Sequence, residues 1–168
     1  MKKHLTILSL LILPACMGGG DGTSVDLTPS GPSASMNAEF NPLLNGVRMD
    51  AGESELFYDE RVGQAAQIHA NDMLVNNELS IFLAGTERDM GDTLNSLGYG
   101  WQDIGQMVAQ GNYSLAGVLS EWEANGSPAG SGGGGSDELT FEDYVEFGIA
   151  KAGSGNDQRW VLLLTNPN

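Results

Sequence analysis

The stretch GYGWQDIGQMVAQG, residues 98–111, decides how this 168-residue chain folds. Ile104 and the run Met107-Val108-Ala109 predict a short strand, because apolar residues bounded by glycines are typical of a strand between two turns. Gln106, inside that strand, carries a neutral amide. The stretch could be a functional site, a site that has lost its charge, or an ordinary core strand, and the flanking sequence has to separate these alternatives.

Helical periodicity surrounds this strand. It predicts four helices, over residues 39–49, 59–76, 90–97 and 114–125. Pro42 would fit the first turn of the first helix, and Ser114 is a suitable N-cap for the last. Two further strands, over 144–150 and 160–165, close the chain around a turn at 151–159. This order predicts an α+β fold in which helices cover one antiparallel sheet.

The first sixteen residues, MKKHLTILSLLILPAC, have the pattern of an export signal. Two lysines precede an apolar run that is shorter than the roughly 20 residues needed to span a bilayer. Leu13-Pro14-Ala15-Cys16 resembles the bacterial lipobox, whose cysteine is acylated and becomes the first residue of the mature protein. An ordinary signal peptide that contains a cysteine is the alternative. Because Cys16 is the only cysteine, the chain can form no internal disulfide, and lipidation gives this exported thiol a role.

We therefore divide the chain into a signal peptide over 1–15, a lipidated cysteine and tether over 16–36, and a folded domain over 37–168. Glycine, serine, threonine and proline dominate the tether, which predicts flexibility. A second glycine-rich segment, 126–136, interrupts the domain. We interpret it as a tolerated insertion, with a mobile cover for a neighbouring site as the alternative.

Removing the signal leaves five basic residues against 22 acidic ones, a net charge of −17. Such a surface repels nucleic acid and anionic lipid headgroups, so we predict no nucleic-acid partner. Membrane attachment then depends on the acyl chains of Cys16, since each buried CH₂ contributes about 0.8 kcal/mol. Met17, in place of aspartate, favours an outer-membrane protein that faces the periplasm over an inner-membrane one, if the Gram-negative sorting rule applies.

Groups for catalysis or metal binding are scarce. His4 lies in the signal, so His69 is the one histidine of the mature chain, which excludes paired-histidine metal motifs. His69 lies on the apolar stripe of the helix over 59–76, so we predict a packed, hydrogen-bonded imidazole, with a catalytic role as the alternative. The acidic cluster over 137–146 could offer carboxylates to a cation, but it lacks EF-hand spacing and we interpret it as a solvated face.

A set of segments between about residues 40 and 166 occurs in a characteristic order. They are Leu44-Asn45-Gly46-Val47-Arg48, Ala66…His69-Ala70…Asp72-Met73, Gly98-Tyr99…Trp101…Gly105-Gln106-Met107-Val108-Ala109…Gly111, Trp122 and Phe147-Gly148-Ile149-Ala150. Together they resemble the bacterial branch of the CAP superfamily, the SCP-like domain of cysteine-rich secretory, antigen 5 and pathogenesis-related 1 proteins. The resemblance implies a three-layer α-β-α sandwich, with a small antiparallel sheet between helices and a cleft on one side.

Members of that family often place two histidines and one or two glutamates in the cleft, where they can hold a divalent metal. Carried over by motif, the first histidine falls on Ile81 and the glutamate falls on Gln106. The second histidine should lie near 127–130, within the glycine-rich segment. Ile81 can neither ligate a metal nor transfer a proton, and Gln106 has the size of glutamate without its charge. The resemblance thus implies a degenerate cleft, with no catalytic residue, metal or cofactor.

From these observations we predict a lipid-anchored protein of the bacterial cell envelope whose CAP-like domain is a non-catalytic binding or scaffold module. Its ligand could be a peptide, a cell-wall fragment, a lipid or another envelope protein. The alternative is a hydrolase-type enzyme that uses carboxylate and hydroxyl groups of the cleft, although no spacing among the 22 acids selects a pair. Converging carboxylates in an open cleft would favour the enzyme, and apolar side chains filling that space would favour the binding module.

Overall fold

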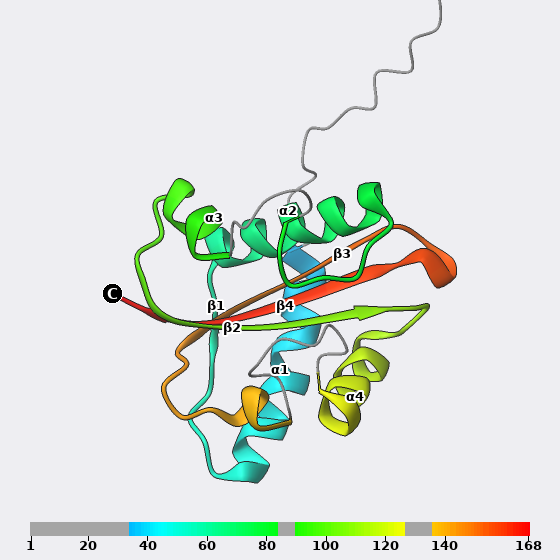
Figure 1. Ribbon diagram of the computed structural model, residues 1–168. Helices are drawn as coiled ribbons and strands as arrows, with labels where there is room; N and C mark the ends of the chain where they lie inside the picture. The colour runs from blue at the N-terminus through cyan, green and yellow to red at the C-terminus, as the bar shows by residue number, and fades with distance from the viewer. Residues whose placement is uncertain (1–33, 84–89, 127–135) are drawn as a thin grey trace, which may run out of the picture.

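Two layers of helices enclose a sheet in the computed structural model, which describes residues 34–83, 90–126 and 136–168 (Figure 1). Helices α2 (Glu60–Asn76) and α3 (Met90–Ser96) cover one face, and α1 (Ala34–Ala51) and α4 (Leu115–Asn125) cover the other. The sheet contains β1 (Phe57–Tyr58), β2 (Trp101–Gln110), β3 (Glu146–Ala152) and β4 (Arg159–Pro167). Short 3₁₀ turns span Ser136–Thr140 and Gly155–Asp157. The expected α-β-α sandwich is confirmed.

The strands lie in the order β1-β3-β4-β2, so β1 and β2 form the two edges of the sheet. β4 pairs antiparallel with both β2 and β3, and Leu163 is opposite Gln106 on one side and Gly148 on the other. β1 pairs parallel with β3, which makes the sheet mixed and not wholly antiparallel as predicted. The prediction missed β1 because two residues give no period from which a strand can be recognised.

Side chains alternate across the sheet and form two apolar clusters, one against each helical layer. Within β4, Trp160, Leu162 and Leu164 pack in the cluster of the α1 and α4 layer, whereas Val161 and Leu163 pack in the cluster of the α2 and α3 layer. Because helices cover both faces, the strand is a continuous apolar run, as its sequence predicted.

Helix α2 packs unusually close to β3. A Cβ atom added to Gly148 would overlap the backbone nitrogen of Gly63, so only glycine permits this approach. The helix begins at its N-cap Asp59, whose side chain accepts hydrogen bonds from the N–H groups of Arg61 (2.8 Å) and Val62 (3.3 Å). These bonds satisfy donors that the first turn of a helix otherwise leaves unpaired.

Helix α1 differs from its prediction at the N-terminal end. It begins at Ala34, so residues 34–36, which were assigned to the tether, form its first turn, and Pro42 lies inside the helix and not in its first turn. The reason is a tertiary contact that no local pattern reveals. Buried Asn37 donates to the Ile149 carbonyl (3.3 Å) and accepts from the Ile149 N–H (3.1 Å), which holds the extra turn against β3.

The remaining elements lie close to their predicted positions, and β2 is longer than the predicted short strand, with ten residues. Ser114 is the N-cap of α4, as expected. Cys16, the signal peptide and residues 127–135 of the glycine-rich segment lie outside the described residues. Within the described part of the chain, no helix combines the length and the apolar character needed to cross a membrane.

Candidate ligand-binding groove

A groove of about 470 Å³ opens beside the C-terminal end of edge strand β2. Its lining comes from β2 and the residues after it, from helix α4, from the segment after α2 and from the turn between β3 and β4: Leu79, Ala109, Gln110, Gly111, Tyr113, Glu121 and Asn156. The lining combines apolar and aromatic walls with two side-chain amides and a single carboxylate. This combination can recognise a polar ligand, and it contains no imidazole.

The turn after β2 shapes this groove. Gly111 has a φ of +146°, and a Cβ atom there would lie 2.8 Å from the ring of Tyr113, so the position requires glycine. Its N–H donates to the carbonyl of Gln158 (3.1 Å), which fixes the turn to the start of β4. The turn thereby folds the ring of Tyr113 back over the end of β2.

Helix α4 supplies the opposite wall. Ser114 caps it by accepting from the N–H of Gly117 (3.0 Å), and the helix then places Glu121 at the groove and Trp122 in the apolar core. The Glu121 carboxylate accepts a hydrogen bond from Asn125 (3.0 Å). The indole of fully buried Trp122 donates to the carbonyl of Val108 (3.1 Å), so this side chain covers the outer edge of β2 at that residue.

Gln106, the predicted degenerate position, lies on β2 between the groove and the start of the strand. By strand alternation its side chain shares the α2 and α3 face with Ile104 and Val108, and it is partly buried. Its Nε2 is buried and has no hydrogen-bond partner among the described residues. An unpaired amide donor here offers no base and no negative charge to a metal.

Ile81, the other position predicted to be degenerate, lies on the same face of the sheet. It is partly buried and packs against the apolar cluster beneath α2, together with Leu79 and Leu83. Apolar side chains therefore occupy the segment where the family resemblance placed a histidine. The third position, 127–130, lies outside the described residues.

His69 is packed and hydrogen-bonded, as predicted. It is fully buried on α2, and its Nε2 lies 2.6 Å from the carbonyl oxygen of Ser80, while Nδ1 has no partner among the described residues. Burial lowers the pKa of His69, and this effect outweighs the opposing influence of the Ser80 carbonyl and of Asp72. A neutral imidazole that donates to Ser80 fits this environment, and it braces the segment that leads to Ile81.

The acidic cluster over 137–146 disperses in the structure. Glu138 accepts a hydrogen bond from Tyr144, which packs on the α1 and α4 side, whereas Glu146 accepts from Tyr99 (2.6 Å) on the α2 and α3 side. Burial raises the pKa of Glu138, against the hydrogen bond from Tyr144. Among residues 34–83, 90–126 and 136–168, no three histidine, cysteine or acidic side chains are grouped so that they could hold a metal.

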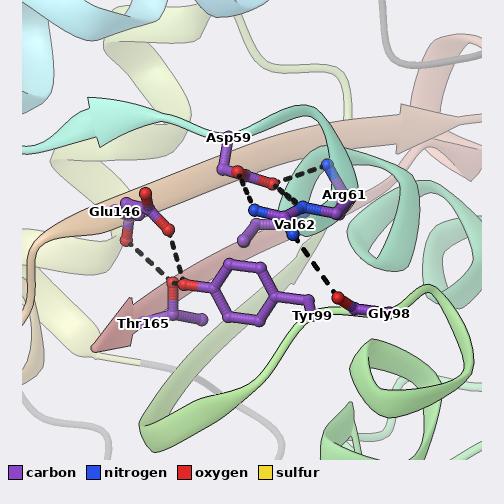
Figure 2. Close-up of polar contacts among 7 residues, drawn as sticks. All are labelled: Asp59, Arg61, Val62, Gly98, Tyr99, Glu146 and Thr165. Atoms are coloured by element: carbon purple, nitrogen blue, oxygen red, sulfur yellow. Dashed lines mark hydrogen bonds and ion pairs between the residues drawn. The ribbon is translucent and has the colours of Figure 1, made fainter. Parts of the chain in front are cut away.

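A polar network at the other end of β2 was not foreseen from the sequence. The Tyr99 hydroxyl contacts Glu146 and Thr165 (2.7 Å), and the Arg61 guanidinium lies over the Tyr99 ring (Figure 2). Arg61 also pairs with Asp59 (2.7 Å). Burial acts to raise the pKa of Asp59, but hydrogen bonds from Arg61 and Val62 and the charge of Arg61 outweigh it, so this pKa is lowered.

Sequence reasoning identified the position of Asp59 at the start of a helix, but it could not bring Tyr99, Glu146 and Thr165 together, because they come from three distant segments. The same limit applies to the groove. Tyr113 and Glu121 follow β2 closely, whereas Leu79 and Asn156 join them only through the sheet topology. No local signal could have identified this set.

The family model of the cysteine-rich secretory proteins, CAP, matches residues 43–164. A search among curated proteins finds no match. Among solved structures, an outer surface protein from Borrelia burgdorferi has a TM-score of 0.66 at 16% identity, and the match covers 80% of this chain and 95% of that one.

Two longer proteins also share the fold. An extracellular protein containing an SCP domain from Bacillus anthracis has a TM-score of 0.61 at 20% identity over 77% of this chain. A cysteine-rich secretory protein from Staphylococcus aureus has a TM-score of 0.57 at 12% identity over 79% of this chain. The matches cover 39% and 38% of those two proteins, respectively. At such identities the likeness establishes the fold alone.

Proposed function

The chain belongs to the cysteine-rich secretory protein family, CAP, and on this premise we propose that it is a non-catalytic binding module held at the bacterial cell envelope by a lipid on Cys16. One fold serves many functions, so the proposal depends on the residues of the site. The observation that carries it is the chemistry of the two degenerate positions, an amide at Gln106 and a packed apolar side chain at Ile81.

The groove offers too few ionisable groups to support hydrolysis. Glycoside hydrolysis takes two carboxyl groups that flank the bond, and nucleophilic catalysis takes a base within hydrogen-bond reach of the nucleophile. Among the lining residues Glu121 has the one carboxylate, and His69, the one histidine in the described residues, is buried against Ser80. These groups favour recognition of a ligand over its turnover.

The size and lining of the groove favour a polar ligand. Its volume of about 470 Å³ is within the range of about 300 to 1,000 Å³ that is typical of ligand pockets. A lipid would be better served by a dry, elongated pocket, whereas Gln110, Glu121 and Asn156 bring polar groups to this one. Of the candidate ligands, a peptide or a cell-wall fragment fits this lining better than a lipid, and another envelope protein could present such a peptide.

We expect zinc to distinguish this function from a metal-dependent one. Calorimetry on the purified full chain should detect only weak binding, of the strength that surface acids provide. Neutralising the exposed pair Glu142 and Asp143 as E142Q/D143N should reduce that binding at least as much as Glu121→Gln does. Tight binding of one zinc ion per chain would contradict the proposal.

Hydrolysis assays test the alternative enzyme. The full chain should not cleave peptide, ester or glycoside substrates above the rate of a boiled sample. If cleavage is detected, Glu121→Gln is the decisive variant, because it removes the one carboxylate of the groove. Turnover that this variant abolishes would establish a hydrolase and exclude the binding module.

Envelope attachment is tested separately. The signal over 1–15, the lipobox-like end at Cys16 and the acidic mature chain support attachment through acyl chains, to the outer membrane facing the periplasm. Two of the similar structures belong to proteins described as extracellular or outer surface proteins, which is consistent with export. In fractionated cells, Cys16→Ser should move the protein out of the membrane fraction. A membrane-bound Cys16→Ser variant would contradict the anchor.

A further inference from the structure

The main chain of Gln110 is unpaired on the outer edge of β2. Two observations fix its direction: the Val108 carbonyl, which accepts from Trp122, points away from β4, whereas the Gly111 N–H donates toward Gln158 beside β4. Because successive residues of an antiparallel ladder face alternate sides, the N–H and C=O of Gln110 point outward with those of Val108. Trp122 bonds the Val108 carbonyl, and Gln110 has no such partner within the described ranges.

This unpaired residue lies in the wall of the groove, so an extended ligand can pair with it. A partner residue that donates its N–H to the Gln110 carbonyl and accepts from the Gln110 N–H would extend the sheet by one residue pair, the mode of recognition called strand addition. Trp122 blocks further pairing at Val108. Recognition beyond that single pair must therefore come from side chains of the ligand.

Because side chains alternate along a strand, the position of each ligand residue determines which wall of the groove its side chain meets. The ligand residue paired with Gln110 projects toward the α2 face, where Leu79 forms the wall, so an apolar side chain fits there. The residues before and after it project toward the α4 face, where Glu121 lies. A cationic side chain at either of these positions would meet the one carboxylate of the groove.

The charges of the chain also favour a ligand with cationic side chains. Four basic residues are described: Arg48 and Arg159 are buried, Arg61 pairs with Asp59, and Lys151 stacks on Trp160. Arg159 is opposite Gln110, but its guanidinium donates to the carbonyls of Asp157 and Glu78 and to Asn77. None of the four lines the groove. A second copy of this chain, with its own acidic surface, is a poor occupant for the same reason.

We propose that this groove binds a short extended peptide segment of the pattern basic-apolar-basic, by strand addition at Gln110 and a charge contact with Glu121. The proposal rests on the binding function proposed above and names the chemical class of its ligand.

The test uses the full chain in detergent micelles and the blocked pentapeptide acetyl-Thr-Lys-Val-Lys-Thr-amide as the probe, with binding followed by NMR. Saturable binding is expected, with slowed amide exchange at Gln110. Methylating the valine nitrogen removes one main-chain donor and retains all charges, so it should weaken binding about tenfold, the effect of one hydrogen bond lost at an otherwise matched site. The peptide with glutamate in place of both lysines should not bind.

Variants of the protein test the same two contacts. Gln110→Pro removes the outward N–H and should weaken binding about tenfold, whereas Gln110→Ala retains the N–H and should weaken it less than about threefold. Glu121→Gln should weaken binding several-fold and reduce its dependence on salt. Thermal unfolding of each variant verifies that the fold is retained.

Several outcomes would overturn the proposal. Equal binding of the plain and N-methylated peptides would show attraction by charge alone, and absence of saturable binding would exclude this ligand class; the binding module would then remain open to another ligand. Dimerisation of the full chain that Gln110→Pro abolishes would identify a second copy as the occupant. Cleavage of the pentapeptide, detected by mass spectrometry, would overturn the proposed function itself.

Discussion

The two edges of the sheet differ in how their outward main-chain groups are hydrogen-bonded. At the β1 edge, Asn45 bonds both main-chain groups of Leu56, accepting from its N–H (2.8 Å) and donating to its carbonyl (3.1 Å). At the β2 edge, Trp122 bonds the Val108 carbonyl, and Gln110 is left facing the groove. Exposed edges invite pairing with other chains, so proteins usually cover them. The comparison indicates that polar groups at the β1 edge stabilise the fold, whereas the main chain of Gln110, beside the groove at the β2 edge, is available to a ligand.

The largest expected effect comes from removing the cover of the β2 edge. Trp122→Ala should lower the free energy of unfolding by about 3 to 5 kcal/mol, because it leaves a cavity against Phe40 and removes the hydrogen bond that the indole donates to the Val108 carbonyl. Denaturant unfolding measures this loss. Trp122→Phe retains most of the volume but not the hydrogen bond, so it should lose less of the free energy of unfolding than Trp122→Ala. Equal losses would mean that packing of this side chain does not contribute to the stability of the β2 edge.

At the β1 edge, Asn45→Ala should lower the free energy of unfolding by about 3 kcal/mol. The buried N–H and C=O of Leu56 would both lose their partner, and each unsatisfied buried group costs about 1 to 3 kcal/mol. Asn41→Ala is the matched control, because it removes only the contact between the Asn41 and Asn45 side chains. If the two variants unfold at the same denaturant concentration, Asn45 does not secure this edge.

Tyr99→Phe should have a smaller effect, about 2 kcal/mol, since it removes one hydroxyl that contacts the Glu146 carboxylate and Thr165. Glu146 is opposite Phe57 of β1, so this network supports the β1 edge from within the sheet (Figure 2). Denaturant unfolding again provides the measurement. Glu146→Gln retains an acceptor for the hydroxyl, so it should lose less than Tyr99→Phe; the opposite order would contradict this account.

The stability of the segment after α2, which supplies Leu79 to the groove, should decrease in acid because His69 becomes protonated. Its pKa is lowered in the folded state, so the neutral imidazole stabilises the fold fully above the unfolded pKa of about 6.5, and this contribution is lost as pH falls through the folded pKa. Unfolding experiments between pH 7 and pH 5 should therefore show decreasing stability. His69→Gln cannot titrate and should flatten that slope; an unchanged slope would assign the effect to other groups.

Much of the architecture could be predicted from the sequence, because many of its elements depend on local patterns or on short motifs. Gly148, the helix over 59–76 and the cap Ser114 were all recognisable from local pattern and motif. The motif residues that carried the family resemblance prove to be structural: Asn45 covers an edge, Arg48 donates to the carbonyls of Ser54, Leu139 and Phe141, and Trp122 covers the other edge.

The groove itself was not predicted from the sequence, and neither Ile81 nor Gln106 lines it. That Ile81 and Gln106 carry no ionisable group follows from side-chain chemistry alone, and their assignment as degenerate cleft positions stays a prediction. Strand β1 and the early start of α1 were missed, because each depends on contacts between distant residues, such as Asn37 with Ile149. The meeting of Leu79, Glu121 and Asn156 depends in the same way on the order of the strands.

The smallest expected effect on stability tests the comparison of edges most directly. Gln110→Pro should change the free energy of unfolding by less than about 1 kcal/mol, because the N–H that it removes points away from β4 and Pro is tolerated at such edge positions. Ala109→Pro, one residue earlier, removes an N–H that faces β4 and adds volume to the core, so it should lose about 2 to 4 kcal/mol. Denaturant unfolding measures the loss of free energy in the two variants, and the difference between these losses shows which N–H is bonded to β4. Similar losses would mean that Gln110 is already paired in the folded chain, and the groove would then have no free main chain to offer a ligand.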